Sequence, residues 1–162
     1  MADKSIKICC GALVLNDDEK ALLVRLNRAS ELGERWSIPM NIANYGEKTE
    51  DSLMKAMEKE YGVKIQILRA IGFIDEIKSD EHLHKVYFLC RIENGNFNLK
   101  NNKNYVEFKW FSAKDIPEDA SINEVLLPMY ILKYITVREC AFCFCCLHII
   151  NMITFISPAA PP

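Results

Sequence analysis

The hydrophobic and polar positions of the chain form short apolar runs separated by polar turns. Residues 6–15 and 21–26 are apolar runs of strand type around a polar turn, so we expect them to form a hairpin. A second pair of runs, at 64–75 and 83–92, flanks a charged turn and predicts a second hairpin. One more strand is expected at 105–111, where aromatic residues dominate.

Between the two pairs of strands, one segment has the spacing of an amphipathic helix. Leu53, Ala56, Met57 and Glu60 recur there at intervals of three or one residues, so they share one face of a helix. Thr49 is the expected N-cap, acidic residues fill the first turn, and Gly62 is expected to end the helix. Residues 36–39 are expected to end a strand, because proline cannot continue a central strand, and Trp36 is expected in the core.

The C-terminal part of the chain contains two unlike segments. Residues 119–135 predict a terminal helix, in which Pro128 is expected to cause a kink or a later start. Residues 137–162 are mostly apolar and rich in cysteine, so we divide the chain into a domain at 1–136 and a tail at 137–162. The apolar part of the tail is close to the shortest membrane-spanning helices. An unstructured appendage, a membrane anchor and a zinc site are the alternatives for this tail.

Composition and charge narrow the class of protein. The chain has 162 residues, enough for one domain with its own core, and the 26% of charged residues is ordinary for a globular protein. The net charge of -2 gives no basic surface of the kind that nucleic-acid-binding domains carry. The seven cysteines are spread unevenly, which does not suit a secreted disulfide framework and predicts an intracellular, cytoplasmic protein.

Residues 41–63 resemble the signature of the Nudix hydrolase family, G-x5-E-x7-R-E-U-x-E-E-x-G-U, in which U is a bulky apolar residue. Aligned on the closing glycine, the chain keeps the family residue at Glu47, Met57, Glu60, Gly62 and Val63, and has Lys55 at the arginine. The resemblance implies an α/β fold in which a mixed sheet is sandwiched between helices. It also implies Mg²⁺- or Mn²⁺-dependent hydrolysis of a diphosphate bond in a nucleotide-type substrate.

The segment 107–117 resembles another family pattern, in which E-x-x-W-F is followed by an aspartate and a proline. In some family members a glutamate near this tryptophan binds a metal or acts as a base, so the resemblance makes Glu107 and Glu60 the candidate catalytic residues. It likewise makes Glu47 and Glu60 the candidate metal ligands, and Arg25 the candidate for substrate phosphates. The alternatives are a strand carboxylate paired with a lysine for Glu107, and an exposed strand arginine for Arg25.

Besides Lys55, three positions of the signature differ from the family: Asn41 replaces a glycine, while Ala56 and Lys59 replace glutamates. Residues four apart share one face of a helix, so carboxylates at positions 56 and 60 would converge on one ion. Magnesium prefers several oxygen ligands, and here Glu60 remains beside the ammonium of Lys59. We therefore expect hydrolysis to be weak or absent.

Three functional hypotheses follow from the sequence. The first is a Nudix domain that binds a nucleotide-type small molecule with little or no turnover. The alternatives are an active pyrophosphatase that uses the surviving carboxylates, and an interaction module tethered to a membrane by the tail. The family resemblance also raises the expectation of a homodimer. His82 and His84 are expected to be solvated or hydrogen-bonded, because two side chains are too few for a metal site.

Overall fold

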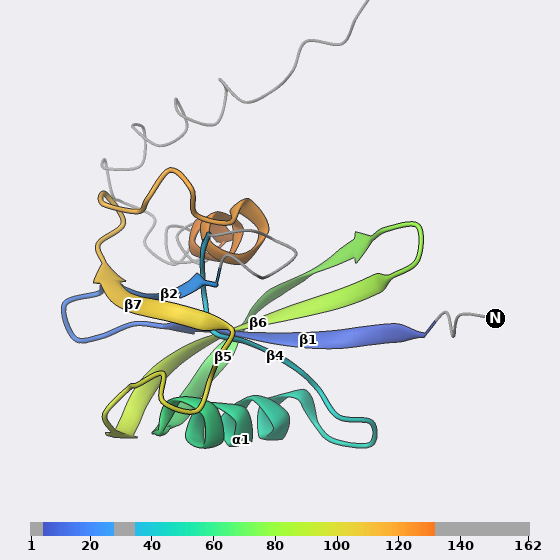
Figure 1. Cartoon of the computed structure of the whole chain (residues 1–162), viewed down its shortest axis with the longest axis horizontal. Helices are drawn as coiled ribbons and strands as arrows, with labels where there is room; N and C mark the ends of the chain where they lie inside the picture. The colour runs from blue at the N-terminus through green and yellow to red at the C-terminus, as the bar shows by residue number, and fades with distance from the viewer. Residues whose placement is uncertain (1–4, 28–34, 132–162) are drawn as a thin grey trace, which may run out of the picture.

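The computed structural model describes residues 5–27 and 35–131, which fold into two β-sheets with helices on opposite sides (Figure 1). The first sheet has the strand order β4 (Met40–Ile42), β1 (Ile6–Val14), β6 (His82–Gly95) and β5 (Val63–Ile77). The second sheet has the order β3 (Trp36–Ser37), β2 (Ala21–Leu26) and β7 (Tyr105–Phe111). Strands β1 and β6 run parallel while β1–β4 and β5–β6 are antiparallel, so the first sheet is mixed.

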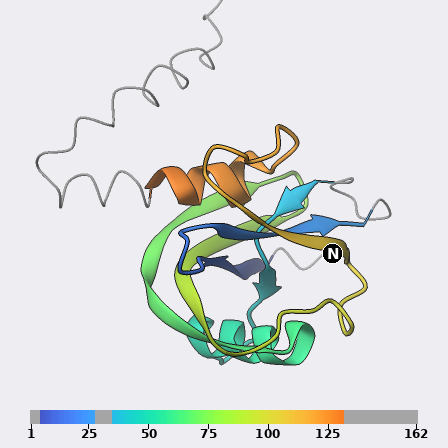
Figure 2. The same cartoon turned by 90° about the vertical axis from the view of Figure 1, so that its left-hand side faces the viewer.

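The helices complete the layers of the fold. Helix α1 (Thr49–Tyr61) lies against one side of the sheets. On the opposite side lies a helical segment that begins as the π-helix η1 (Ile122–Leu126) and continues as an α-helix over 127–131 (Figure 2). This arrangement confirms the predicted sandwich of a mixed sheet between helices. Within the described ranges no helix is long and apolar enough to cross a membrane, and the predicted tail lies outside those ranges.

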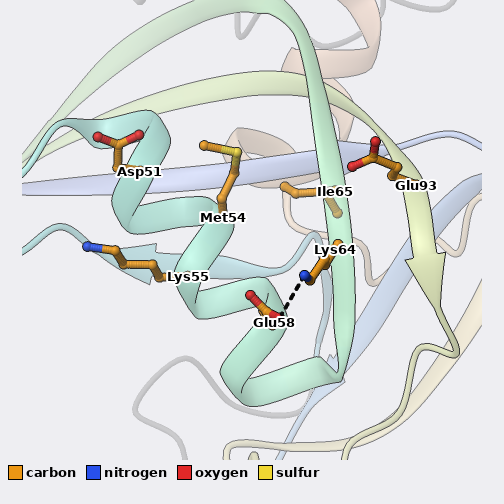
Figure 3. Close-up of a pocket in the computed structure, with 7 residues that line it drawn as sticks. All are labelled: Asp51, Met54, Lys55, Glu58, Lys64, Ile65 and Glu93. Atoms are coloured by element: carbon orange, nitrogen blue, oxygen red, sulfur yellow. Dashed lines mark ion pairs between the residues drawn. The ribbon is translucent and has the colours of Figure 1, made fainter.

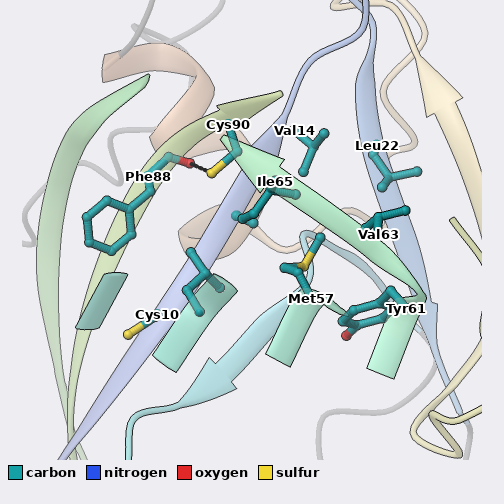
Figure 4. Close-up of a cluster of buried hydrophobic side chains, with 11 residues drawn as sticks. Cys10, Val14, Leu22, Met57, Tyr61, Val63, Ile65, Phe88 and Cys90 are labelled. Carbon is teal, nitrogen blue, oxygen red and sulfur yellow. Dashed lines mark hydrogen bonds between the residues drawn. The ribbon is translucent and has the colours of Figure 1, made fainter. Parts of the chain in front are cut away.

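Two apolar clusters hold the layers together, one on each side of the first sheet. The cluster beneath α1 includes Cys10, Val14, Leu22, Met57, Tyr61, Val63, Ile65, Phe88 and Cys90 (Figure 4). Leu13 belongs to the second cluster, because successive side chains of a strand point to opposite faces. Residues 9–14 of β1 are thus buried on both faces, which explains why this part of the strand is continuously apolar.

The first predicted hairpin is wrong. Strands β1 and β2 lie in different sheets, and only a single bridge between Leu15 and Ala21 joins their ends. Both strands are apolar on both faces, so the sequence pattern carries no information about which neighbour each strand pairs with. The second predicted hairpin is confirmed, since β5 and β6 pair antiparallel and extend beyond the predicted ends.

The structure confirms one predicted helix boundary and corrects another. The N-cap of α1 is Lys48, not Thr49, and its side chain makes no capping hydrogen bond. Gly62 ends α1 in the left-handed conformation, as predicted. Before Pro128 the helix has a π-turn, in which the Leu126 amide donates to the Ser121 carbonyl, and residues 132–135 lie outside the described part.

A buried ionic network fastens the C-terminal helical segment to the sheets. The Lys85 side chain, on β6, is 5% exposed, and its ammonium lies 2.6 Å from Glu76 and 2.9 Å from Glu124. The hydroxyl of Ser37 donates a hydrogen bond to Glu124. Burial alone would lower the pKa of Lys85, but the hydrogen bond to Glu76 and the charge of Glu124 outweigh it and raise that pKa.

Candidate functional site

Helix α1 carries most of the family signature, and its inner side fixes the orientation of the rest. Leu53, Met57 and Tyr61 are each 1% exposed and pack into the first apolar cluster. Ala56 lies at the edge of this buried side, whereas Lys59 is exposed and Glu60 is half-buried. The side chains available for chemistry on this helix therefore lie along one flank, at positions 55, 56, 59 and 60.

Glu47, in the loop before α1, is engaged by two donors. The Lys55 ammonium forms an ion pair with it, and the side-chain amide of Asn44 donates a hydrogen bond over 2.9 Å. These two hydrogen bonds, the one from Lys55 being the stronger, hold the pKa of Glu47 below its usual range. The pair joins the loop to the middle of the helix, so Glu47 has a structural partner in addition to its predicted role as a metal ligand.

Glu60, near the C-terminal end of α1, is held by Asn102. The buried amide of Asn102 donates to Glu60 Oε2 over 2.6 Å, and the same nitrogen lies 3.2 Å from the hydroxyl of Tyr61. The backbone N–H of Asn104 donates to Asn102 Oδ1, which fixes the direction of the amide. One carboxylate oxygen of Glu60 is therefore already occupied by a donor.

The asparagine-rich segment between β6 and β7 is fastened to the last turn of α1. The side chain of Asn101 donates to the carbonyl of Lys59 over 3.0 Å, and the Asn98 amide donates to the carbonyl of Tyr61 over 3.0 Å. These two contacts satisfy carbonyl groups that the end of a helix leaves unpaired, and Asn102 adds its side-chain contacts with Glu60 and Tyr61. The sequence analysis did not single out Asn102, although the run of asparagines in a loop was a visible signal.

The candidate residues on the second sheet form their own charged group. Glu107 on β7 lies opposite Arg25 on β2, with 3.7 Å between their charged atoms, and the Lys109 ammonium lies 2.5 Å from Glu107. The hydrogen bond from Lys109, and then the charge of Arg25, hold the pKa of Glu107 below its usual range. The pair with Lys109 matches the alternative that the sequence left open for Glu107. Trp36 is buried as predicted, and the Arg25 guanidinium lies 5.8 Å from its ring centre.

The candidate carboxylates do not gather around one point. Among residues 5–27 and 35–131, no three side chains of His, Cys, Asp or Glu form a group able to hold a metal ion. His82 and His84 both contact the same oxygen of Asp75, at 3.0 and 2.9 Å, which confirms the hydrogen-bonded alternative for these histidines. The structure therefore assigns a nitrogen partner to each of Glu47, Glu60 and Glu107.

A pocket of about 320 Å³ lies beside α1, where the helix meets the start of β5 and the end of β6 (Figure 3). Its lining comprises Asp51, Met54, Lys55, Glu58, Lys64, Ile65 and Glu93. The side chains of Lys64 and Glu58 form an ion pair across it at 3.6 Å. The pocket contains none of the four candidate residues Arg25, Glu47, Glu60 and Glu107.

Comparisons with known proteins agree with the fold. A family model described as the NUDIX domain matches residues 7–130. The structure resembles a MutT protein from Methanosarcina mazei, with a TM-score of 0.68, 16% identity, and coverage of 86% of this chain and 99% of that one. It resembles an ADP-ribose pyrophosphatase from Streptococcus suis (TM-score 0.59, 23% identity, 78% and 92% coverage).

A UDP-X diphosphatase is a further similar structure, with a TM-score of 0.63, 20% identity, and coverage of 82% of this chain and 66% of that one. At these identities the likeness concerns the fold alone. Comparison of the sequence with curated proteins finds no significant match.

Proposed function

The chain belongs to the NUDIX family, and from this premise we propose that it binds a nucleotide-type diphosphate ligand at the flank of α1 with weak or no hydrolysis. The family supports a ligand of this class. Two of the similar structures bear names that refer to ADP-ribose and to UDP-X, and the proposal extends that class of ligand to this chain. We also take the protein to be cytoplasmic, on the distribution of its cysteines.

The observation that carries the proposal is the set of donor atoms on the α1 flank. Ala56 offers no ligand atom, Lys59 offers a cation, and Glu60 has one of its two oxygens bound to Asn102. NUDIX hydrolases in general use divalent metals such as Mg²⁺, and Mg²⁺ is held by several oxygen ligands in near-octahedral geometry. One partly occupied carboxylate next to an ammonium does not fit such an ion.

The alternative of an active enzyme would require other carboxylates to replace the missing ligands. Glu47 and Glu107 are the remaining candidates, and each is engaged in an ion pair with a lysine. Recruiting either one to a metal would break its pair and leave that lysine close to the ion. These contacts favour binding without efficient turnover.

The test measures metal binding and hydrolysis together on the full chain. Calorimetric titration with Mg²⁺ and Mn²⁺ is run beside chromatographic detection of the nucleoside monophosphate released from a panel of nucleoside diphosphate derivatives. The double substitution Ala56→Glu with Lys59→Glu restores both family carboxylates, and the control Lys114→Glu makes the same lysine-to-glutamate change outside the α1 flank. We expect the parent and the control to show neither metal binding nor hydrolysis, and the double variant to gain metal binding.

A parent chain that turns over a substrate at about 1 s⁻¹ or faster, the usual enzymatic range, would overturn the proposal. Thermal unfolding of each variant is followed by circular dichroism, because Ala56 is buried, at 8% exposed, and a glutamate there must not unfold the helix. If the double variant is folded and still binds no metal, then residues other than those at positions 56 and 59 also prevent metal binding.

A further inference from the structure

The charge at the C-terminal end of α1 differs from that of the rest of the helix. Lys55, one turn earlier, is neutralised by Glu47. Lys59 is exposed, and within the described residues its ammonium has no carboxylate within ion-pair distance. The neighbouring Glu60 directs an oxygen to Asn102 instead. Lys59 is thus an uncompensated cation at a position where the family signature has a glutamate.

The fastened asparagine-rich segment adds two further cations to the same region. Lys100 and Lys103 are exposed, and neither forms an ion pair with any residue of the described ranges. Residues 101 and 102, which lie between these lysines, are hydrogen-bonded to Lys59 and Glu60 of the helix. The backbone that carries all three ammonium groups is therefore held together by direct contacts. We call Lys59, Lys100 and Lys103 the lysine rim.

A lysine in the last turn of a helix is favoured by the helix dipole, so stability alone permits Lys59. None of the three lysines forms an ion pair within residues 5–27 and 35–131, so each ammonium is available to an anionic ligand. Phosphate groups suit this role, because ammonium groups bind them as point charges.

We propose that the lysine rim binds the phosphates of a nucleotide-type ligand directly, without a divalent cation. This inference rests on the proposed function and specifies how the ligand is held. In it, the side chain of Lys59 supplies the positive charge at the position from which family members would supply a metal ligand. The bound species is then the metal-free nucleotide, and chelation of divalent cations leaves binding intact.

The test uses ADP as the probe and isothermal titration of the full chain, once with EDTA and once with excess Mg²⁺. We expect ADP to bind in EDTA at least as tightly as in Mg²⁺, and binding to weaken as salt is raised, because exposed charges are screened. Lys59→Gln is expected to weaken binding about tenfold in EDTA, equivalent to about 1.4 kcal/mol. Lys59→Arg keeps the charge and should retain most of the affinity, whereas Lys114→Gln should leave it unchanged.

Binding that occurs only with Mg²⁺, or that is the same in Lys59→Gln and the parent, overturns the inference, as does the lack of any binding in EDTA. Phosphate release is measured in the same Mg²⁺ samples, which separates this result from the proposed function. Silent hydrolysis with Mg²⁺-dependent binding refutes the lysine rim and leaves the proposed function standing. Rapid hydrolysis refutes the proposed function itself.

Discussion

The replacement Lys85→Met tests the buried ionic network, because it removes the cation that contacts both Glu76 and Glu124. The side chain of Glu124 is 8% exposed and that of Glu76 is 22% exposed, so Glu124 in particular would be left with its charge buried. Removing one partner of a buried ion pair typically costs about 3–5 kcal/mol. Because Glu76 is partly exposed and Ser37 still donates a hydrogen bond to Glu124, we expect the free energy of unfolding to fall by about 3 kcal/mol.

The pH of the measurement follows from the pKa shifts. Hydrogen bonds from Lys85 and then from Lys78 lower the pKa of Glu76, so its contribution to stability is present above the ordinary value of 4.5 and is lost as the pH falls through the lower folded-state value. The pKa of Lys85 is raised above 10.5, so its contribution is present below that value and is lost only as the pH rises through the higher folded-state value. At neutral pH both contributions are present in full.

The assay is urea unfolding of the full chain near pH 7, followed by circular dichroism, with Glu124→Gln and the double variant completing a mutant cycle. The double variant should be less destabilised than the sum of the two single variants, since Lys85 and Glu124 contact each other directly. Lys78→Met is the matched control, because that lysine is exposed and pairs with Glu76 at the surface. A loss below about 1 kcal/mol for Lys85→Met, the range of a surface pair, would refute the reasoning.

Three other substitutions test single features of the fold by the same unfolding measurement. Tyr87→Phe removes a buried hydroxyl that has no hydrogen-bond partner among the described residues, so stability should stay level or rise by up to about 1 kcal/mol, and a clear loss would point to a hidden partner. Leu53→Ala should cost about 2–5 kcal/mol, because this 1% exposed side chain anchors α1, and a loss under about 1 kcal/mol would contradict its place in the core. Gly62→Ala should cost about 1–2 kcal/mol, since φ is +72° and the new Cβ would lie 2.6 Å from Asn98 Nδ2, and an unchanged midpoint would contradict this backbone geometry.

Most elements of the fold could be predicted because they have a local pattern. The helix has its period of three and four, and the β5–β6 hairpin has a charged turn between two β-prone runs. The pairing of β1 could not be predicted, since a strand apolar on both faces fits several neighbours equally well. The three-residue strand β4 was missed because it is too short to show an alternation.

The candidate site was predictable only in part, for a similar reason. Glu107 and Lys109 are two apart on one strand, so their pairing was open to inference from spacing alone. The contact of Asn102 with Glu60 joins residues 42 positions apart and depends on how the loop returns to the helix. No local pattern encodes such a contact, and this one decides which oxygen of Glu60 remains available.

The two sides of α1 have a consequence for how this protein can change over evolutionary time. Leu53, Met57 and Tyr61 secure the helix from below, while positions 59 and 60 stand apart from that buried surface. Selection for a stable fold therefore exerts little pressure on positions 59 and 60, which can change while the core is kept. For the same reason, new ligand groups can be engineered at these two positions without redesigning the core.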